Sequence, residues 1–214
     1  MKNSYFSVGE YCSTAHQIRR CTNNSEAYFF DWLVTRGNTF DFMCRSNDAF
    51  LQSMGWELVD GGIRLLDRYS GLLFQHEFKT SGGGVVDANL VEEHLNVARD
   101  KFLYLKDKFL DALKASHRGV IIRAENGIKS TEQAKKLLEQ LRETFLPTNA
   151  SLKFVIASTQ LYQGEEFSPD HLFVHLDNPV PPNGSDAWKG NDQSWSRLFD
   201  LAEQKLVFPT SGVS

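Results

Sequence analysis

Cys12 is the residue whose type and position best fit a chemical role. It follows a short β-prone run that ends at Gly9, and the pattern over residues 11–21 predicts a helix. The first turn of a helix has unpaired N–H groups and a partial positive charge, which lower the pKa of a thiol and stabilise an oxyanion. We therefore expect Cys12 to act as a nucleophile. The alternative is that it is a small buried apolar residue, as free cysteines more often are.

A nucleophilic thiol needs a base, and the chain has six histidines. His76 ends a strand-like run beside a glycine-rich loop and is the best candidate. His16 is four residues after Cys12, but a histidine on the same helix is poorly aimed at a thiol one turn earlier. Asp31 lies among aromatic residues and could orient the imidazole, as the acid of a triad does. For each residue a structural role is the alternative, and for Asp31 this is an N-cap or a pair with an arginine.

Four further residues are candidates for substrate binding: Glu10, Arg20, Trp32 and Arg123. Arg123 ends an apolar strand, where its guanidinium could clamp a carboxylate or phosphate through two hydrogen bonds. An ion pair with Glu125 or Glu10 is the alternative. In a polar segment near the C-terminus, tryptophans at 188 and 195 could wall a pocket or pack into the core.

Composition and charge exclude several classes of protein. The chain has 214 residues, with 23 basic and 27 acidic side chains, and no basic run that would indicate nucleic-acid binding. Three cysteines in a chain of this length indicate free thiols in a reducing compartment, and we expect a bacterial cytoplasm. Their spacing is not that of a zinc site, and we predict no metal or cofactor. The N-terminus lacks an apolar signal segment, and no stretch approaches the ~18 apolar residues of a membrane span.

The hydrophobic pattern predicts a single α/β domain over residues 1–214. Continuous apolar strands alternate with amphipathic helices, which indicates three layers, with a mainly parallel sheet covered by helices on both faces. A small antiparallel insertion is expected around 56–86. The predicted strands of the main sheet are 5–8, 119–123, 152–158 and 172–176. The predicted helices are 11–21, 39–54, 89–115, one that begins after a capping box at Ser130 and Gln133, and 194–206.

Five blocks, in this order, resemble an uncharacterised bacterial family that carries the label of papain-like cysteine peptidases. The first is Ser7-Val8-Gly9-Glu10-Tyr11-Cys12-Ser13-Thr14-Ala15 with Gln17-Ile18-Arg19-Arg20. The others are Phe30-Asp31-Trp32-Leu33, His76-Glu77-Phe78, Val120-Ile121-Ile122-Arg123, and Trp188-x-Gly190 with Trp195. The resemblance spans nearly the whole chain and implies a Cys12 nucleophile with His76 as its base. Asp31 falls within a block, but its catalytic role is our inference.

Together these features predict a cysteine-dependent hydrolase or acyl transferase that acts on an amide, ester or thioester. A small molecule, a peptide and a glycan all remain open as substrates. One alternative is a non-catalytic module that holds an anionic ligand with Arg20 and Arg123. Another is a glycan-modifying transferase in which Cys12 is structural. A Cys12 sulfur within about 4 Å of an imidazole nitrogen, in an open cleft, would favour the enzyme.

Overall fold

The main sheet contains five strands in the order β1-β6-β7-β9-β8, of which the first four run parallel. The structure is a computed structural model that describes residues 2–161, 164–177 and 187–209. The strands are β1 Ser4–Ser7, β6 Gly119–Ala124, β7 Lys153–Ser158, β8 Glu166–Phe167 and β9 His171–His175. The four predicted strands of this sheet are therefore confirmed. The short β8, which pairs antiparallel with β9, is an addition that the pattern did not predict.

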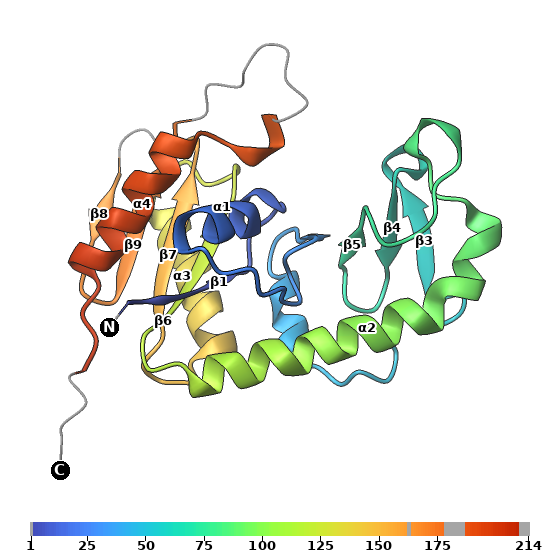
Figure 1. Cartoon of the computed structure of the whole chain (residues 1–214), viewed down its shortest axis with the longest axis horizontal. Coiled ribbons are helices and arrows are strands. Elements are labelled where there is room, and N and C mark those ends of the chain that lie inside the picture. The colour runs from blue at the N-terminus through green and yellow to red at the C-terminus, as the bar shows by residue number, and fades with distance from the viewer. Residues whose placement is uncertain (1, 162–163, 178–186, 210–214) are drawn as a thin grey trace.

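Helices pack on both faces of this sheet (Figure 1). They are α1 Ser13–Thr22, α2 Ala88–Ala115, α3 Thr131–Phe145 and α4 Asp192–Lys205. Side chains alternate along β6, so that Val120 and Ile122 pack with α1 and α4. Ile121 points to the other face and joins the core cluster that contains α2 and α3. The chain is thus an α/β protein with a mostly parallel sheet.

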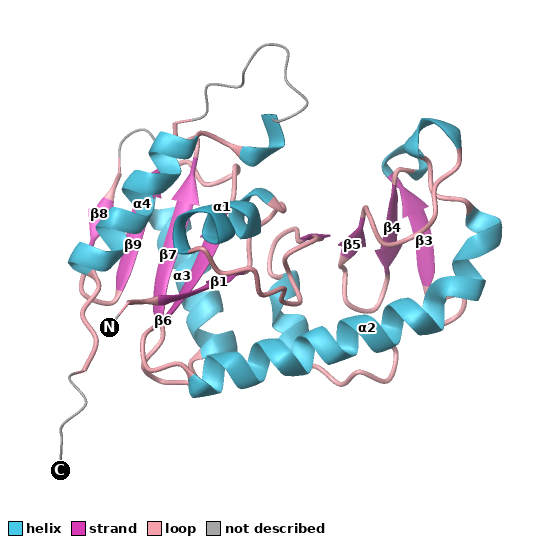
Figure 2. Ribbon diagram, viewed as in Figure 1, coloured by secondary structure: helices cyan, strands magenta, loops and turns pink. Residues whose placement is uncertain are grey.

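A second, antiparallel sheet lies beside the first (Figure 2). Its strands are β2 Leu33–Val34, β3 Trp56–Val59, β4 Arg64–Asp67 and β5 Leu73–Phe74, in the order β2-β5-β4-β3. The predicted antiparallel element around 56–86 is confirmed, but it also takes in β2, which comes much earlier in the chain. The helix predicted over 39–54 is wrong beyond its first turn and a half. A 3-10 helix ends at Cys44, and the chain continues through turns in which Leu51 and Met54 have positive φ.

Helix α2 connects the two sheets and runs along both of them (Figure 1). Its apolar stripe, which includes Leu95, Phe102 and Phe109, lies in one core cluster with residues of both sheets. Lys106 on this stripe is buried, and its ammonium donates to the Phe42 and Arg45 carbonyls and to Asn47. The two sheets therefore share one packed core along α2, and the Lys106 hydrogen bonds fix α2 to the segment over 42–47. Across the part of the chain that the structure describes, no helix has the length and apolar character needed to cross a membrane.

Candidate functional site

The turn between β1 and α1 places Cys12 at the first helix end. Cys12 is the N-cap of α1, and its carbonyl accepts the His16 N–H at 3.0 Å. The N–H groups of Ser13, Thr14 and Ala15 donate to no other described residue. They are the unpaired donors that a helix start provides. The predicted position of Cys12 at the carboxyl end of the first strand is confirmed.

Close packing inside this turn requires glycine at position 9. A Cβ atom added to Gly9 would lie 2.2 Å from Thr14 Oγ1. Thr14 is fully buried, and its hydroxyl has no hydrogen-bond partner among the described residues. The other side of the turn is held by Thr35, whose hydroxyl donates to the Gly9 carbonyl at 2.6 Å. The approach of Thr14 to Gly9 therefore sets where α1 begins relative to β1.

Arg123 anchors the same turn from the end of β6. Its side chain is fully buried and donates to the Val8 carbonyl, to the Thr35 hydroxyl and carbonyl, and to the Gly37 carbonyl. It also forms a two-point ion pair with Glu125, with donor–acceptor distances of 2.9 and 2.7 Å. All of its donors are engaged, so it has none to offer a ligand. The prediction that Arg123 clamps an anion in the Cys12 cleft is wrong, because the side chain is buried and its hydrogen bonds hold the β1–α1 turn against the segment over 35–37.

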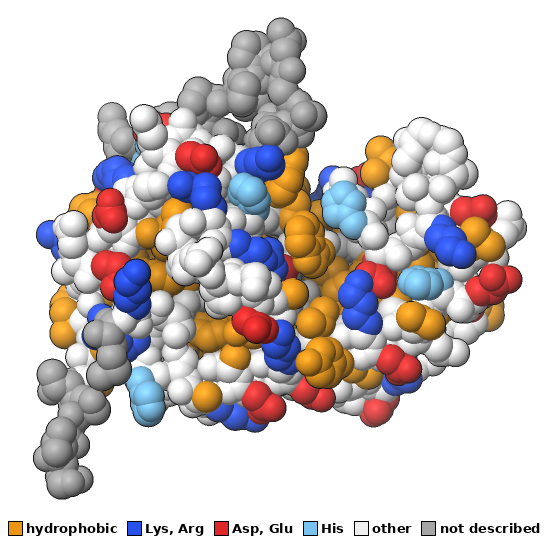
Figure 3. All heavy atoms as spheres, in the orientation of Figure 1, with side chains coloured by type: hydrophobic (Ala, Val, Ile, Leu, Met, Phe, Trp, Pro, Cys, Tyr) orange, Lys and Arg blue, Asp and Glu red, His pale blue; other side chains and the backbone are white. Residues whose placement is uncertain are grey.

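A cavity of about 670 Å³ opens at the carboxyl edge of the parallel sheet, next to Cys12. One wall follows the ends of the parallel strands, and another comes from the antiparallel sheet. Figure 3 shows the surface hollowed between these two parts of the molecule. Its described lining residues are Tyr11, Cys12, Ser13, Trp32, Arg64, Gln75, His76, Ala124, Asn126, Thr159, Leu176, Asp177, Trp188, Gly190, Asn191 and Trp195. Ligands bind at this edge in open α/β sheets in general.

Cys12 and His76 line this same cavity but come from different sheets. His76 follows β5 and is exposed, whereas Cys12 is half-buried. Among the described residues, neither side chain forms a hydrogen bond or an ion pair, so no polar interaction joins Cys12 to His76. Burial raises the pKa of the Cys12 thiol above its ordinary value, and the thiol's own backbone N–H offsets this only in part. Burial therefore opposes the lowering of this pKa that the helix end was predicted to provide.

Asp31 is held away from this cavity by other partners. Its buried carboxylate pairs with Arg19 and accepts the Tyr28 N–H at 2.9 Å. It lines a separate, much smaller pocket. Burial raises the pKa of this carboxyl, while the Tyr28 N–H and Arg19 lower it. The structure therefore supports the alternative of a carboxylate paired with arginine, and it does not bring Asp31 to His76.

Of the other predicted binding residues, some line the cavity and others do not. Trp32 lines the cavity and is 45% exposed. Arg20 donates to the Asp192 carbonyl and the Ser196 hydroxyl of α4, which ties α1 to α4 and takes the guanidinium out of the cavity lining. Glu10 is not among the lining residues, and its carboxylate accepts the Asn126 N–H at 3.2 Å. Of these three, only Trp32 borders the cavity.

Several lining residues were not predicted. Thr159 and Gln75 directly follow β7 and β5, whereas Asn126 and Asp177 lie two residues beyond the ends of β6 and β9. A polar residue just beyond each predicted parallel strand was the signal that could have identified Asn126, Thr159 and Asp177. His16 does not line the cavity; its ring lies 5.1 Å from the Trp188 ring. Among the described residues, no group of three or more His, Cys, Asp or Glu side chains is arranged to hold a metal ion.

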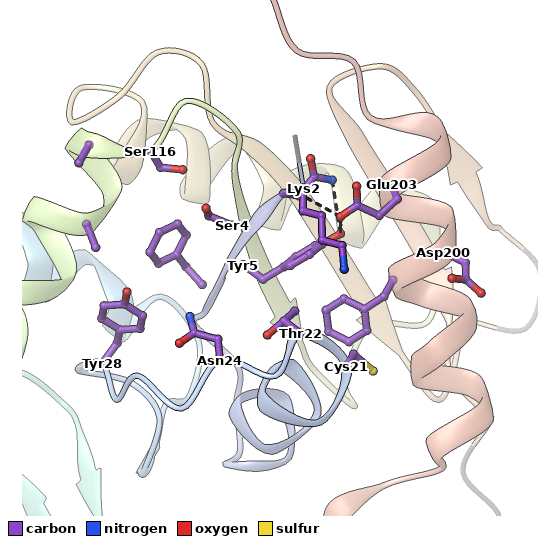
Figure 4. A pocket seen from close by; sticks show the side chains of 15 residues that line it. Lys2, Ser4, Tyr5, Cys21, Thr22, Asn24, Tyr28, Ser116, Asp200 and Glu203 are labelled. Atoms are coloured by element: carbon purple, nitrogen blue, oxygen red, sulfur yellow. Dashed lines mark hydrogen bonds between the residues drawn. The ribbon is translucent and has the colours of Figure 1, made fainter.

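A second cavity, of about 610 Å³, lies at the opposite, amino-terminal edge of the sheet (Figure 4). Figure 4 shows Tyr5 and Glu203 side by side on its wall, where the Tyr5 hydroxyl donates to the Glu203 carboxylate at 2.9 Å. Burial raises the Tyr5 pKa above its ordinary value. Cys21 lines this cavity, but none of the predicted catalytic residues does. The catalytic hypothesis therefore depends on the cavity beside Cys12.

Comparison with protein-family models, with curated proteins and with solved structures found no significant match. The resemblance to papain-like cysteine peptidases therefore rests on the sequence blocks alone.

Proposed function

We propose that this chain is a cysteine-dependent acyl-transfer enzyme, a hydrolase or an acyl transferase, built on a three-layer α/β fold. The observation that carries the proposal is that Cys12 and His76 border one cavity at the carboxyl edge of the parallel sheet. The unpaired N–H groups at the start of α1 supply the third requirement, a site for the oxyanion. The sequence resemblance points to the same two residues.

In the proposed reaction, Cys12 Sγ forms a bond to the carbonyl carbon of an amide, ester or thioester. His76 accepts the thiol proton and passes it to the leaving nitrogen, oxygen or sulfur as the carbonyl–heteroatom bond breaks. The product is a thioester on Cys12. Water or a second nucleophile then attacks this thioester with His76 as base, and the thiol is regenerated. The N–H groups of Ser13 and Thr14 stabilise the oxygen of each tetrahedral intermediate.

The resting site is not an assembled ion pair. Burial raises the pKa of the Cys12 thiol, and among the described residues no hydrogen bond joins Cys12 to His76. A substrate seated between the two walls must bring them to the distance at which a proton can transfer. Catalytic hydrogen bonds commonly shorten in this way when the substrate binds.

The reporter ester p-nitrophenyl acetate tests this function. Expected results are a burst of nitrophenolate and an acetyl group that peptide mapping finds on Cys12. Cys12→Ala should abolish both, whereas Cys21→Ser and Cys44→Ser should leave them unchanged. His76→Ala should slow acetylation by about 10²- to 10⁴-fold, as loss of a general base does. His16→Ala and Asp31→Asn should have little effect, since neither residue lines the cavity.

Acetylation spread evenly over the three cysteines, and unaffected by His76→Ala, would contradict the proposal. The second candidate would then lead: a non-catalytic binding module, favoured because no hydrogen bond joins Cys12 to His76 among the described residues. Its anionic form is weakened, because Arg20 and Arg123 are engaged by other protein groups. A glycan-modifying transferase with a structural Cys12 predicts, in contrast, that Cys12→Ala retains activity.

A further inference from the structure

The cavity beside Cys12 concentrates the tryptophans of this protein. The chain has four tryptophans, and three of them line the cavity: Trp32, Trp188 and Trp195. Trp32 and Trp188 are 45% and 43% exposed, while Trp195 is buried. The fourth, Trp56, lies on β3 and donates to Glu92 at 2.7 Å, away from the cavity. The Arg19 guanidinium lies 5.3 Å from the Trp32 ring and the His16 ring lies 5.1 Å from the Trp188 ring, but both tryptophans remain partly exposed. Partly exposed indoles gathered in a concave site indicate a ligand that packs against them.

Three amide side chains add hydrogen-bond donors to the same cavity. The amide oxygens of Gln75, Asn126 and Asn191 are already occupied by protein donors. These donors are the Arg64 Nε, the Thr159 hydroxyl and the Ser194 N–H, at distances of 3.2, 3.2 and 2.8 Å. Each amide therefore keeps its NH₂ group for a ligand, since no described residue accepts from it. The cavity offers fixed polar donors beside apolar rings.

The charges on the lining restrict the kind of ligand. Apart from the Cys12 thiol and the Tyr11 phenol, the ionisable groups on the described lining belong to Arg64, His76 and Asp177. Arg64 already pairs with Asp60 at 2.6 Å, so a polyanion would find no unengaged arginine or lysine on the described lining. A purely apolar chain would leave the three amide groups without partners, at a cost in free energy. The ligand should be uncharged overall, with both apolar faces and hydroxyl edges.

A pyranose ring has this combination. Its axial C–H bonds are polarised by the neighbouring oxygens and pack on the negative face of an indole, while its hydroxyls accept from amide NH₂ groups. The volume of about 670 Å³ lies within the range of small-ligand sites. We propose that this cavity binds a neutral carbohydrate. Resting on the proposed function, this means that the acyl group attacked by Cys12 is carried on a sugar.

A glycan array of neutral and acetylated oligosaccharides, probed with the full chain as Cys12→Ala, tests the ligand class. The variant removes the nucleophile and leaves the tryptophans in place. At least one glycan should bind, and titration of that glycan should quench tryptophan fluorescence. Trp32→Ala and Trp188→Ala should each weaken binding about three- to tenfold, as loss of a stacked ring does. Trp56→Ala is the matched control and should change the affinity less than about twofold, within the scatter of mutations that touch no ligand.

Three results would overturn the carbohydrate proposal. One is an array on which no neutral or acetylated glycan binds. Another is a Trp56→Ala loss as large as those of Trp32→Ala and Trp188→Ala. The third is binding of N-acetyl-trialanine or adenosine diphosphate in preference to every glycan. The acyl-transfer function is tested separately, because glycan binding that survives in Cys12→Ala supports the ligand class even where p-nitrophenyl acetate fails to acetylate Cys12.

Discussion

Arg123→Met tests whether the buried guanidinium holds the turn that carries Cys12. The substitution keeps much of the apolar stem but removes every donor. It leaves the Val8, Thr35 and Gly37 carbonyls and the Glu125 carboxylate without the N–H groups that they accept. Removing one member of a buried ion pair costs about 3–5 kcal/mol, much of it from the group left behind. The 20% exposure of the Glu125 side chain lets water relieve part of this, which favours the lower half of that range.

Urea unfolding followed by tryptophan fluorescence measures this loss. A decrease of about 3–5 kcal/mol corresponds to a fall in melting temperature of about 6–20 °C for a chain of this size. Arg142→Met is the matched control, because Arg142 forms an exposed helical pair with Glu139 that is worth about 0.5 kcal/mol or less. A second readout is acetylation of Cys12, which Arg123→Met should slow in the folded fraction, since the turn is no longer held at Val8 and Thr35.

If Arg123→Met lowers the free energy of unfolding by less than about 1 kcal/mol, Arg123 does not hold the turn, since ordinary surface changes cost up to about 0.5 kcal/mol. If Arg123→Met does not fold, Arg123→Lys provides the test. It keeps the charge near Glu125 but cannot reach all the carbonyls, so an intermediate loss is expected. A double-mutant cycle that combines Arg123→Met with Thr35→Val adds a further check. Thr35 accepts from Arg123 and donates to Gly9, so the losses in unfolding free energy from the two changes should not be additive.

The remaining predictions concern packing and titration. Gly9→Ala should lower the free energy of unfolding by about 1–3 kcal/mol, because the added Cβ overpacks against Thr14. The loss should be smaller in a Thr14→Ala background. Gly82→Ala is the control: Gly82 has open space around it, so the change should be near neutral in thermal unfolding. Iodoacetamide alkylation of Cys12 can be measured against pH in a Cys21→Ser and Cys44→Ser background. Its rate should rise at higher pH than for free cysteine, because burial raises the Cys12 pKa. A rate profile shifted to lower pH would contradict this. Asp31, whose folded pKa is raised above 3.8, binds its proton more tightly when folded, so its contribution to stability should fall as pH rises from that value to the raised one. Asp31→Asn should lack this fall when urea unfolding is measured from pH 3.8 upward, and an unchanged pH profile would exclude Asp31 as its source.

Much of the architecture follows from local pattern. The apolar runs of β6, β7 and β9 and the stripe of α2 predicted these elements, because a buried strand and a one-sided helix leave different periods in the sequence. The segment over 39–54 misled because its aromatic residues have helical spacing, although they pack around turns rather than along one helix face. The pairing of β2 with β5 joins residues some forty positions apart, and no local period encodes it.

In the candidate site, too, some features follow from local sequence and others from contacts between distant segments. The position of Cys12 at the start of a helix just after a strand was predictable from the sequence, because it depends on neighbouring residues. The partner of each charged group depends on the tertiary fold: Asp31 pairs with Arg19, Arg123 pairs with Glu125, and His76 lines the same cavity as Cys12. Partner choice depends on distances between segments remote in the chain. A buried charge needs an opposite charge and hydrogen-bond partners close enough to offset the cost of its desolvation.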